Sequence, residues 1–309
     1  MDLAEAVVEF QQLLPRIRPD CVDQFISWIK EQSGSEQEKS TQEKILDSIR
    51  DDIRQSIPFN ALGPTEKIHF ATNGPNSDCN PRNTVHVDAF LYDDDAIDSL
   101  CEEGKLSRNH CMQCGSQDVR PLNFITHSAS ITEIKFIFQY LLPELGGKVV
   151  LDVGSRTGAI LYGAYLFTNA SQIVGVEMDE FFCQLQQKVV EKYAFGDRIK
   201  IVHNDVQNEE QLLQCSDVII LNNVFEFFVP TDVQERLWCF LSEKIRRSGT
   251  LLITIPSIEE SLQHLTTSID VTTWIKPVDI SEKLKHASIR LGNSDEMSEL
   301  DGIFMYQVL

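Results

Sequence analysis

The chain has 309 residues, and its 42% content of hydrophobic residues is enough for one large core plus a smaller unit. Its 47 acidic residues outnumber 27 Lys and Arg, which gives a formal net charge of −20 at pH 7. Proteins bind nucleic acids through basic side chains that neutralise phosphates, so this balance disfavours direct binding of RNA or DNA.

Residues 1–60 are predicted to form a helical N-terminal extension. Its clearest helix begins at the sequence Ser40-Thr41-Gln42-Glu43, which has the pattern of a capping box. Apolar residues then recur on one helix face. They are Ile45, Leu46, Ile49, Ile53 and Ile57. The extension is either a small bundle packed on the main domain or a lid or docking arm for a substrate.

Residues 61–123 are predicted to be a loop-rich segment that carries a small insert with cysteines. Glycine and proline interrupt residues 58–85, which is typical of a loop-rich connection. Thr84–Tyr92 alternates between apolar and polar residues like a strand, and Asp93–Cys101 is expected to form a short helix.

The insert contains a candidate zinc site. Cys111 and Cys114 are three positions apart and Gly115 follows, a turn that brings two thiolates to within about 2.3 Å of a zinc ion. A structural site needs four ligands, but the chain has no second Cys-x-x-Cys pair. The candidates for the other two are Cys101, His110, His127, Cys79 and His86, and we take the set as Cys101, His110, Cys111 and Cys114. Unligated cysteines or a redox pair are the alternatives.

Residues 124–309 are predicted to form the main domain. Its first element is expected to be a capped, strongly apolar helix within residues 124–147, before Gly146-Gly147.

The centre of the domain is the stretch Val149–Gly158. Here a short apolar run ends in an acid and a turn with two glycines, and the next residues, Ala159–Leu166, have helical spacing. Without a Cβ, Gly154 and Gly158 permit backbone conformations and a close ligand approach that other residues block. The N-terminus of the helix adds unpaired N–H groups and partial positive charge. Strand, loop and helix therefore indicate a site for a small cofactor.

Further short apolar strands follow, separated by helical segments. Ile173–Glu177 ends in an acid 25 positions after Asp152, where a carboxylate accepts hydrogen bonds from a ribose diol. This alternation predicts a doubly wound, mostly parallel, seven-stranded α/β sheet. The other predicted strands lie in Ile199–Asp205, Val218–Leu221, Gly249–Pro256, Val271–Val278 and Ile303–Leu309.

In these motifs the chain resembles a class I S-adenosylmethionine-dependent methyltransferase over about residues 125–309. Asp152–Gly158 matches the family's glycine-rich first motif, Glu177 its ribose-binding acid and Asp205 the acid next to adenine. Asn222–Phe225 is similar to the Asn-Asn-Phe motif of the non-SET histone lysine methyltransferases, with Val224 in place of the aromatic residue. The Asn/Asp-Pro-Pro-Tyr/Phe motif of many amino-methylating enzymes is absent.

The resemblance implies S-adenosylmethionine as the cofactor and a set of residues that would bind it. They are Asp152, Gly154, Ser155, Gly158, Glu177, Met178, Asp205, Val206 and Asn222. It also implies that Thr126, His127 and Ser128 reach the active site, although a lone histidine is more often structural.

The resemblance further places an acceptor beside Asn222, Asn223 and Phe225, which we take as the catalytic residues. The two asparagines would orient the acceptor, and no side chain is expected to be an obligatory base. Phe225, Phe227 and Phe228 would line a channel of low dielectric, where the pKa of an amine is lowered. Packing in the core is the alternative role for at least two of these rings.

The expected function is therefore methyl transfer to a protein substrate, on lysine. The charge of −20 would favour a basic peptide or protein partner, although acids can equally serve solubility. A small-molecule N- or O-methyltransferase and a non-catalytic binding module with this fold are the alternatives.

The lengths of the apolar runs and the spacing of the cysteines indicate the cellular compartment of the protein. No apolar run approaches the roughly 20 residues that span a bilayer, and the N-terminus lacks the positive charge of a signal peptide. Eight cysteines at scattered spacings are expected to be reduced thiols. We therefore expect a protein of the cytoplasm or nucleus without membrane association, while its oligomeric state stays open.

Overall fold

A computed structural model describes residues 3–18, 21–22, 25–26, 39–70, 76–113, 117–291 and 299–309. The chain divides into two compact units, residues 1–44 and 45–309. In the first unit, helix α1 (Leu3–Leu13) continues into the 3-10 helix η1 (Leu14–Arg16), where Pro15 fits because the first turn needs no N–H donor. The spacing of Val22, Phe25, Ile26 and Ile29 also predicts a helix, but most of this segment lies outside the described residues.

Helix α3 (Thr41–Arg54) confirms the predicted capping box. The Glu43 N–H donates to Ser40 Oγ at 3.2 Å, and the Ser40 N–H donates to Glu43 Oε2 at 2.8 Å. Three residues of its apolar face, Leu46, Ile49 and Ile53, are buried in the core of the larger unit. The spacing of the apolar residues thus correctly identified the buried face of this helix.

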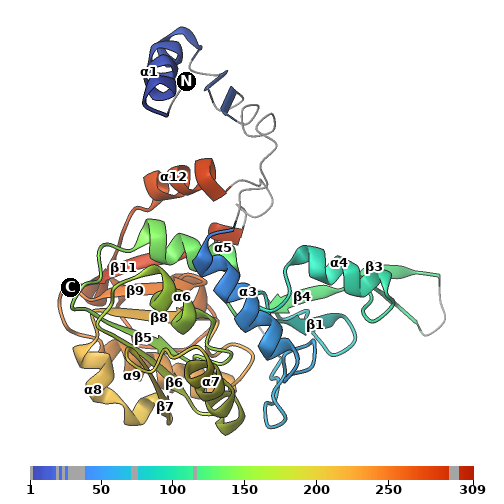
Figure 1. The fold of residues 1–309 in the computed structure, drawn as a ribbon. Helices are drawn as coiled ribbons and strands as arrows, with labels where there is room; N and C mark the ends of the chain where they lie inside the picture. The colour runs from blue at the N-terminus through green and yellow to red at the C-terminus, as the bar shows by residue number, and fades with distance from the viewer. Residues whose placement is uncertain are drawn as a thin grey trace. The chain divides into compact units, whose positions relative to one another are not determined.

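The larger unit is built on a seven-stranded sheet in the order β10-β11-β9-β8-β5-β6-β7 (Figure 1). Strand β11 runs antiparallel to β9 and β10, and the other neighbours pair in parallel. The predicted mostly parallel sheet is therefore confirmed. The strands are β5 (Val149–Val153), β6 (Gln172–Glu177), β7 (Ile199–His203), β8 (Val218–Asn222), β9 (Leu251–Ile255), β10 (Ile275–Pro277) and β11 (Phe304–Val308).

Both faces of the sheet are covered by helices, which explains why its central strands are apolar on both faces. On one face the core includes residues of α3, α5, η3, α6, α7 and α12, and on the other residues of α8, α9, α10 and α11. These helices are α5 (Ile131–Lys135), the π-helix η3 (Phe136–Leu141), α6 (Ala159–Phe167), α7 (Glu180–Lys192), α8 (Glu210–Cys215), α9 (Thr231–Lys244), α10 (Ile258–Leu262), α11 (Val271–Trp274) and α12 (Ser281–Leu291).

The predicted helix within residues 124–147 is wrong in its first part. Strand β4 (Asn123–Thr126) occupies that part and pairs in parallel with β1 (Thr84–Val87) in a separate two-stranded sheet. The helix begins only at Ile131, after a capping box formed by Ser130 and Glu133. Pairing with β1, which is distant in sequence, selects the extended backbone, a choice that local helical spacing cannot reveal.

The predicted strand Val271–Val278 is also wrong in its first half. Residues Val271–Trp274 form α11, whose first turn is capped by Asp270, which accepts a hydrogen bond from the Thr272 N–H at 3.1 Å. Only Ile275–Pro277 pairs with β11, at the edge of the sheet, where Pro277 costs no hydrogen bond within the ladder.

The segment before β4 contains α4 (Asp94–Glu102), which is the short helix expected at the run of acids, and Asp93 caps it. The antiparallel strands β2 (Asn109–Cys111) and β3 (Val119–Pro121) follow. Within the described residues, no helix is both long and apolar enough to cross a bilayer.

Candidate functional site

The candidate site lies at the carboxyl ends of β5 to β9, where the loop between β5 and α6 carries the two glycines. Gly154 and Gly158 both have left-handed backbones, with φ of +72° and +84°. The Gly154 N–H donates to the Val176 carbonyl at 2.8 Å, which ties the loop to β6. Ser155 Oγ donates to Gln186 of α7 at 2.9 Å, and the Gln186 amide donates to the Arg156 carbonyl at 2.7 Å. The loop is thus held by hydrogen bonds to both β6 and α7.

Glu177 ends β6 beside this loop, as predicted. Its two carboxylate oxygens accept hydrogen bonds from the backbone N–H groups of Asp179, at 2.8 Å, and Arg156, at 2.9 Å. Burial raises the pKa of Glu177, whereas these two hydrogen bonds act in the opposite direction. Since each carboxylate oxygen has two lone pairs, both can accept a further hydrogen bond from a ligand hydroxyl.

The other predicted cofactor residues lie around Glu177 and at the end of β7. The side chain of Met178 is 66% exposed, which is unusual for a large apolar residue at a sheet edge. Asp205 caps the 3-10 helix η4 (Val206–Asn208) by accepting from the Gln207 N–H at 2.8 Å, and Val206 is buried. Met178 therefore offers an exposed apolar surface next to the carboxylate of Glu177, whereas Val206 packs in the core.

Asp152 is buried near the carboxyl end of strand β5. Burial raises its pKa to about 8, and the negative charge of Glu177 acts in the same direction. The carboxyl group is therefore mostly protonated at neutral pH and can donate a hydrogen bond.

These residues fit the adenosine half of S-adenosylmethionine better than the methionine half. The carboxylate of Glu177, exposed Met178 and the η4 cap provide the acceptors and the apolar surface that a nucleoside needs. At Gly154, however, a Cβ would lie 2.5 Å from Val224 Cγ2, so the Val224 side chain covers the open face of this glycine. A ligand that contacts Gly154 requires that Val224 shift.

The predicted catalytic residues lie on the loop after β8. Asn222 ends the strand, and Asn223 has a left-handed backbone with φ of +46°, where its N–H donates to the Ile255 carbonyl at 2.7 Å. Phe225 is buried against Trp238, with perpendicular rings 5.7 Å apart. Phe227 is also buried, as expected for core packing, and Phe228 is half-buried.

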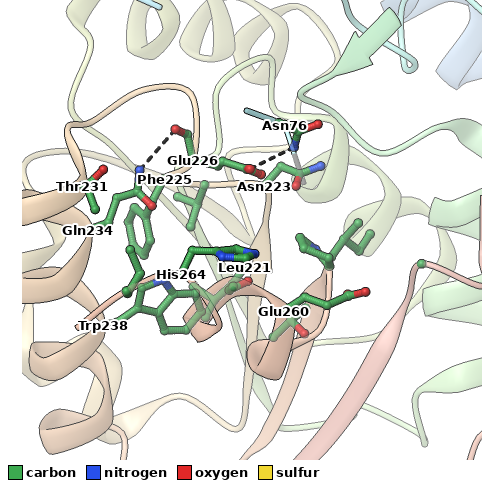
Figure 2. Close-up of a pocket in the computed structure, with 17 residues that line it drawn as sticks. Asn76, Leu221, Asn223, Phe225, Glu226, Thr231, Gln234, Trp238, Glu260 and His264 are labelled. Atoms are coloured by element: carbon green, nitrogen blue, oxygen red, sulfur yellow. Dashed lines mark hydrogen bonds between the residues drawn. The ribbon is translucent and has the colours of Figure 1, made fainter. Parts of the chain in front are cut away.

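This loop borders a cavity of about 320 Å³ at the ends of β8 and β9 (Figure 2). Asn223 and Phe225 line it, whereas Asn222 and the residues of the glycine loop are not among its lining residues. The structure thus brings two of the three predicted catalytic residues to one cavity, next to the predicted cofactor loop.

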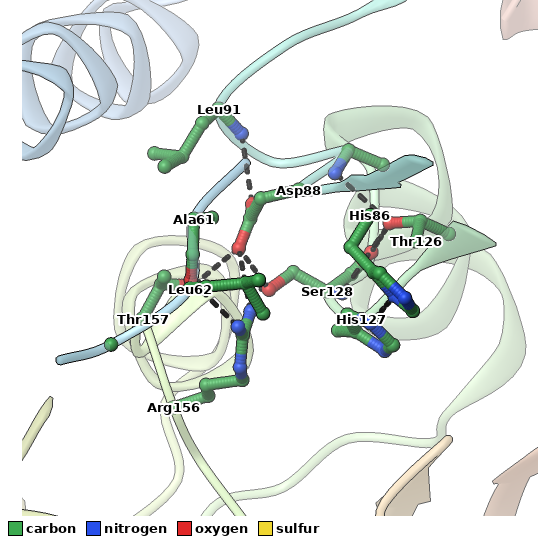
Figure 3. A network of polar contacts seen from close by, with 12 residues as sticks. Ala61, Leu62, His86, Asp88, Leu91, Thr126, His127, Ser128, Arg156 and Thr157 are labelled. Atoms are coloured by element: carbon green, nitrogen blue, oxygen red, sulfur yellow. Dashed lines mark hydrogen bonds and ion pairs between the residues drawn. The ribbon is translucent and has the colours of Figure 1, made fainter. Parts of the chain in front are cut away.

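The glycine loop also carries a buried arginine, Arg156, which contacts Ala61 and Asp88 (Figure 3). Arg156 has a left-handed backbone with φ of +46°, and its guanidinium makes two hydrogen bonds of 2.9 Å to the carboxylate of Glu66. It also donates to the Ala61 carbonyl at 2.6 Å and forms an ion pair with Asp88 at 3.6 Å. The side chain of Arg156 therefore holds residues 61–66 against the glycine loop.

Asp88 extends this network to two hydroxyl groups. Its carboxylate accepts from Ser128 Oγ at 2.5 Å and from Thr157 Oγ1 at 3.3 Å (Figure 3). Burial raises the pKa of Asp88, although Arg156 and the hydroxyls act to lower it. Ser128 Oγ also lies 3.1 Å from Thr157 Oγ1, so Ser128 contacts the glycine loop, and its expected reach to the active site stays a prediction.

His127 instead stacks on His86. The two rings are 5.0 Å apart, and His86 Nδ1 lies 2.8 Å from His127 Nε2. Burial lowers the pKa of both, to about 4 for His86, so both are neutral at pH 7. His127 also packs 4.7 Å from Phe228, which is consistent with a structural histidine.

The structure gives no support for the zinc site. Cys114 lies outside the described residues, and among the residues that are described no three His, Cys, Asp or Glu form a group that could hold a metal ion. Cys101 is half-buried on α4, while His110 and Cys111 are consecutive in β2 and point to opposite sides of the strand. Zinc binding stays a prediction that depends on Cys114.

Four residues of the site were missed in the sequence, namely Arg156, Glu66, Asp88 and Gln186. Arg156 was visible as a basic residue inside the glycine loop, which is an unusual place for a large side chain. Its partners Glu66 and Asp88 are 90 and 68 positions away, and no spacing pattern connects them.

Comparison with known proteins gives limited sequence similarity. No protein-family model matches the chain. An uncharacterized protein of Haemophilus influenzae is 29% identical over 118 residues, which are 37% of this chain and 44% of that protein. The chain thus matches less than half the length of this curated relative.

Several solved structures are similar at low identity. An RNA methyltransferase from Salinibacter ruber, in complex with S-adenosyl-L-homocysteine, is 16% identical with a TM-score of 0.34, over 56% of this chain and 85% of that one. A putative methyltransferase from Escherichia coli is 13% identical with a TM-score of 0.38, over 58% and 88%. A putative methylase from Haemophilus influenzae is 15% identical with a TM-score of 0.37, over 57% and 95%.

The fold itself follows from the sheet of this chain. Five parallel strands in the order β9-β8-β5-β6-β7 are extended by an antiparallel β11 between β9 and β10. With helices on both faces and the glycine loop after β5, this is the doubly wound α/β fold that the sequence predicted.

Proposed function

We propose that the chain is an S-adenosylmethionine-dependent methyltransferase. The observation that carries the proposal is the carboxylate of Glu177, which ends β6 beside the left-handed glycine loop and keeps lone pairs for a ribose diol. Exposed Met178 and the η4 cap at Asp205 support an adenosine site at the same edge.

The residues of the chain would bind and position the reactants. Bound S-adenosylmethionine supplies an electrophilic methyl group to an acceptor lone pair. Asn222 and Asn223 would orient the acceptor through their side-chain amides, and buried Phe225 would exclude water from that side. No side chain at the cavity is required as a base, because an amine can lose its proton to water before the transfer.

The acceptor that we propose is an amine of a basic protein or peptide, on lysine. The formal charge of −20 supports a basic partner and disfavours RNA or DNA. A small-molecule acceptor is the enzymatic alternative, and a screen of cell extracts with labelled methyl groups would distinguish the two.

A binding module without turnover is the second candidate. It is favoured by one specific observation, the Val224 side chain that covers Gly154. If Val224 never shifts, the methionine half of the cofactor cannot reach the loop.

Replacement of Glu177 by Gln is expected to weaken binding of S-adenosylmethionine about tenfold or more, because hydrogen bonds from the ribose hydroxyls to a charged acceptor are lost. Isothermal titration calorimetry of the folded full chain would measure the affinities for S-adenosylmethionine and S-adenosylhomocysteine. Glu243→Gln, which changes an exposed acid on α9, is the matched control. No binding to the folded wild-type chain would reject the proposal.

Replacement of Val224 by Ala is expected to tighten S-adenosylmethionine binding several-fold, because it removes the methyl groups that cover Gly154. The same titration measures it, with Val229→Ala, on the same loop, as a control. Unchanged affinity would show that the cofactor does not contact this face of Gly154.

A further inference from the structure

The cavity beyond Asn223 has an apolar wall and a floor of two strands (Figure 2). Leu221 of β8 and Thr254 of β9 contribute from the sheet, and Phe225 and Trp238 contribute aromatic rings. A volume of about 320 Å³ is within the range of small-molecule sites. The cavity therefore has room for a ligand of about the size of an aromatic amine.

The charged groups of the cavity are acidic. Among the described residues, its lining contains two carboxylates, Glu226 and Glu260, one histidine, His264, and no Lys or Arg. Glu260 is engaged at the start of α10, where it accepts from the N–H and the hydroxyl of Ser257 at 3.2 and 2.9 Å. The cavity thus favours a cation over an anion or a neutral ligand.

Glu226 is the better placed of the two carboxylates to bind a cation. It is half-buried, and Asn76 Nδ2 donates to its Oε1 at 2.8 Å, which fixes the side chain (Figure 2). Since a carboxylate has about four lone-pair sites, this contact leaves acceptor capacity for a ligand. Partial burial strengthens the attraction to a positive charge compared with a fully exposed acid.

Thr254 is a second, independent sign of a ligand. Its side chain is 1% exposed and lines the cavity, yet Oγ1 has no hydrogen-bond partner among the described residues. A buried hydroxyl without a partner destabilises the fold, and valine has nearly the same shape without that cost. Folding alone therefore does not explain a threonine here.

We infer that this cavity binds an organic cation, a primary amine on an apolar stem. The ammonium group pairs with Glu226 and with the hydroxyl of Thr254, while Phe225 and Trp238 contact the stem. The inference rests on the proposed function only in that the bound amine would be the methyl acceptor; amine binding itself requires no cofactor.

The test is calorimetric titration of the full chain with phenethylamine at pH 7, and with 2-phenylethanol as the neutral analogue of the same shape. We expect the amine to bind at least about tenfold tighter than the alcohol, because only the amine carries the charge that Glu226 pairs with. Glu226→Gln should weaken amine binding about tenfold, whereas the control Glu243→Gln should leave it unchanged.

Thr254→Val separates a binding role from a structural one. We expect the variant to unfold at a higher urea concentration, because the free protein no longer buries an unpaired hydroxyl. We also expect it to bind phenethylamine several-fold more weakly, because the hydroxyl no longer accepts a hydrogen bond from the ammonium group. A purely structural hydroxyl would change stability alone, and unchanged amine affinity would overturn its part in the site.

Equal affinity for amine and alcohol, no effect of Glu226→Gln, or no amine binding to the folded chain would each overturn the inference. Titration of the same samples with S-adenosylmethionine keeps the two proposals apart. Amine binding without cofactor binding supports the cation site and rejects the methyltransferase. Cofactor binding without amine binding supports the methyltransferase and rejects the cation site.

Discussion

Replacement of Arg156 by Met is expected to lower the free energy of unfolding by about 3–5 kcal/mol, because it leaves buried carboxylates without their counter-charge. The side chain of Asp88 is fully buried and that of Glu66 is 10% exposed, so water cannot replace the guanidinium at either. Methionine keeps most of the apolar stem but not the cation, so the cation–π contact with Phe182 is lost together with the ion pairs. The cost should therefore come from charge and lost hydrogen bonds.

Urea unfolding of the wild-type chain and the variant would measure this difference. Arg236→Met, which removes an exposed ion pair with Asp232 on α9, should cost less than about 1 kcal/mol and is the matched control. Adding Glu66→Gln and Asp88→Asn to Arg156→Met should restore part of the loss, since no buried charge then remains. A cost no greater than that of Arg236→Met would contradict the role of the network.

Asp152→Asn is expected to make the stability of the protein less dependent on pH. The folded-state pKa of Asp152 is raised to about 8, while an unfolded Asp titrates near about 4. A raised acid pKa gives a stability contribution that is complete below the unfolded pKa and is lost as the pH rises through the folded pKa. Between these values the loss is up to about 1.4 kcal/mol for each pH unit.

The free energy of unfolding measured in urea at pH 5, 7 and 9 would test this. The wild-type chain should lose stability from pH 5 to pH 9, and the variant, whose amide does not titrate, should lose less. At pH 9 the variant should be the more stable of the two. Glu243→Gln controls for the loss of one carboxylate from the chain. Parallel pH curves for Asp152→Asn and wild type would show that the buried carboxyl group does not change charge on unfolding.

The two predictions concern Asp152 and Arg156, and the sequence revealed the place of the first but not the role of the second. Asp152 could be located in advance, because an apolar run followed by an acid and two glycines specifies a strand, a tight turn and a helix start within ten residues. The buried environment that raises its pKa depends on the sheet around it. The role of Arg156 could not be located, because its partners come from residues 61–66 and from the end of β1.

The errors in secondary structure have the same origin. Residues 124–126 and 271–274 carry β-branched and aromatic side chains, which favour strands, but this preference depends strongly on tertiary context. In the first segment, pairing with β1 selected the strand, and in the second, capping by Asp270 selected the helix. By contrast, α3 and the strands β5 to β9 were predicted well because their apolar patterns are long and unambiguous.

The sequence by itself determined the order of strands and helices, the glycine loop and the positions of Glu177 and Asp205 at strand ends. These features depend on local periodicity and on backbone freedom at single residues. Only the tertiary structure decided that Arg156 fastens residues 61–66 over the loop, that Val224 covers Gly154, and that the hydroxyl of Thr254 is left unpaired in an acidic cavity. Such contacts join segments far apart in the chain, and their energies depend on burial, which exists only once the chain has folded.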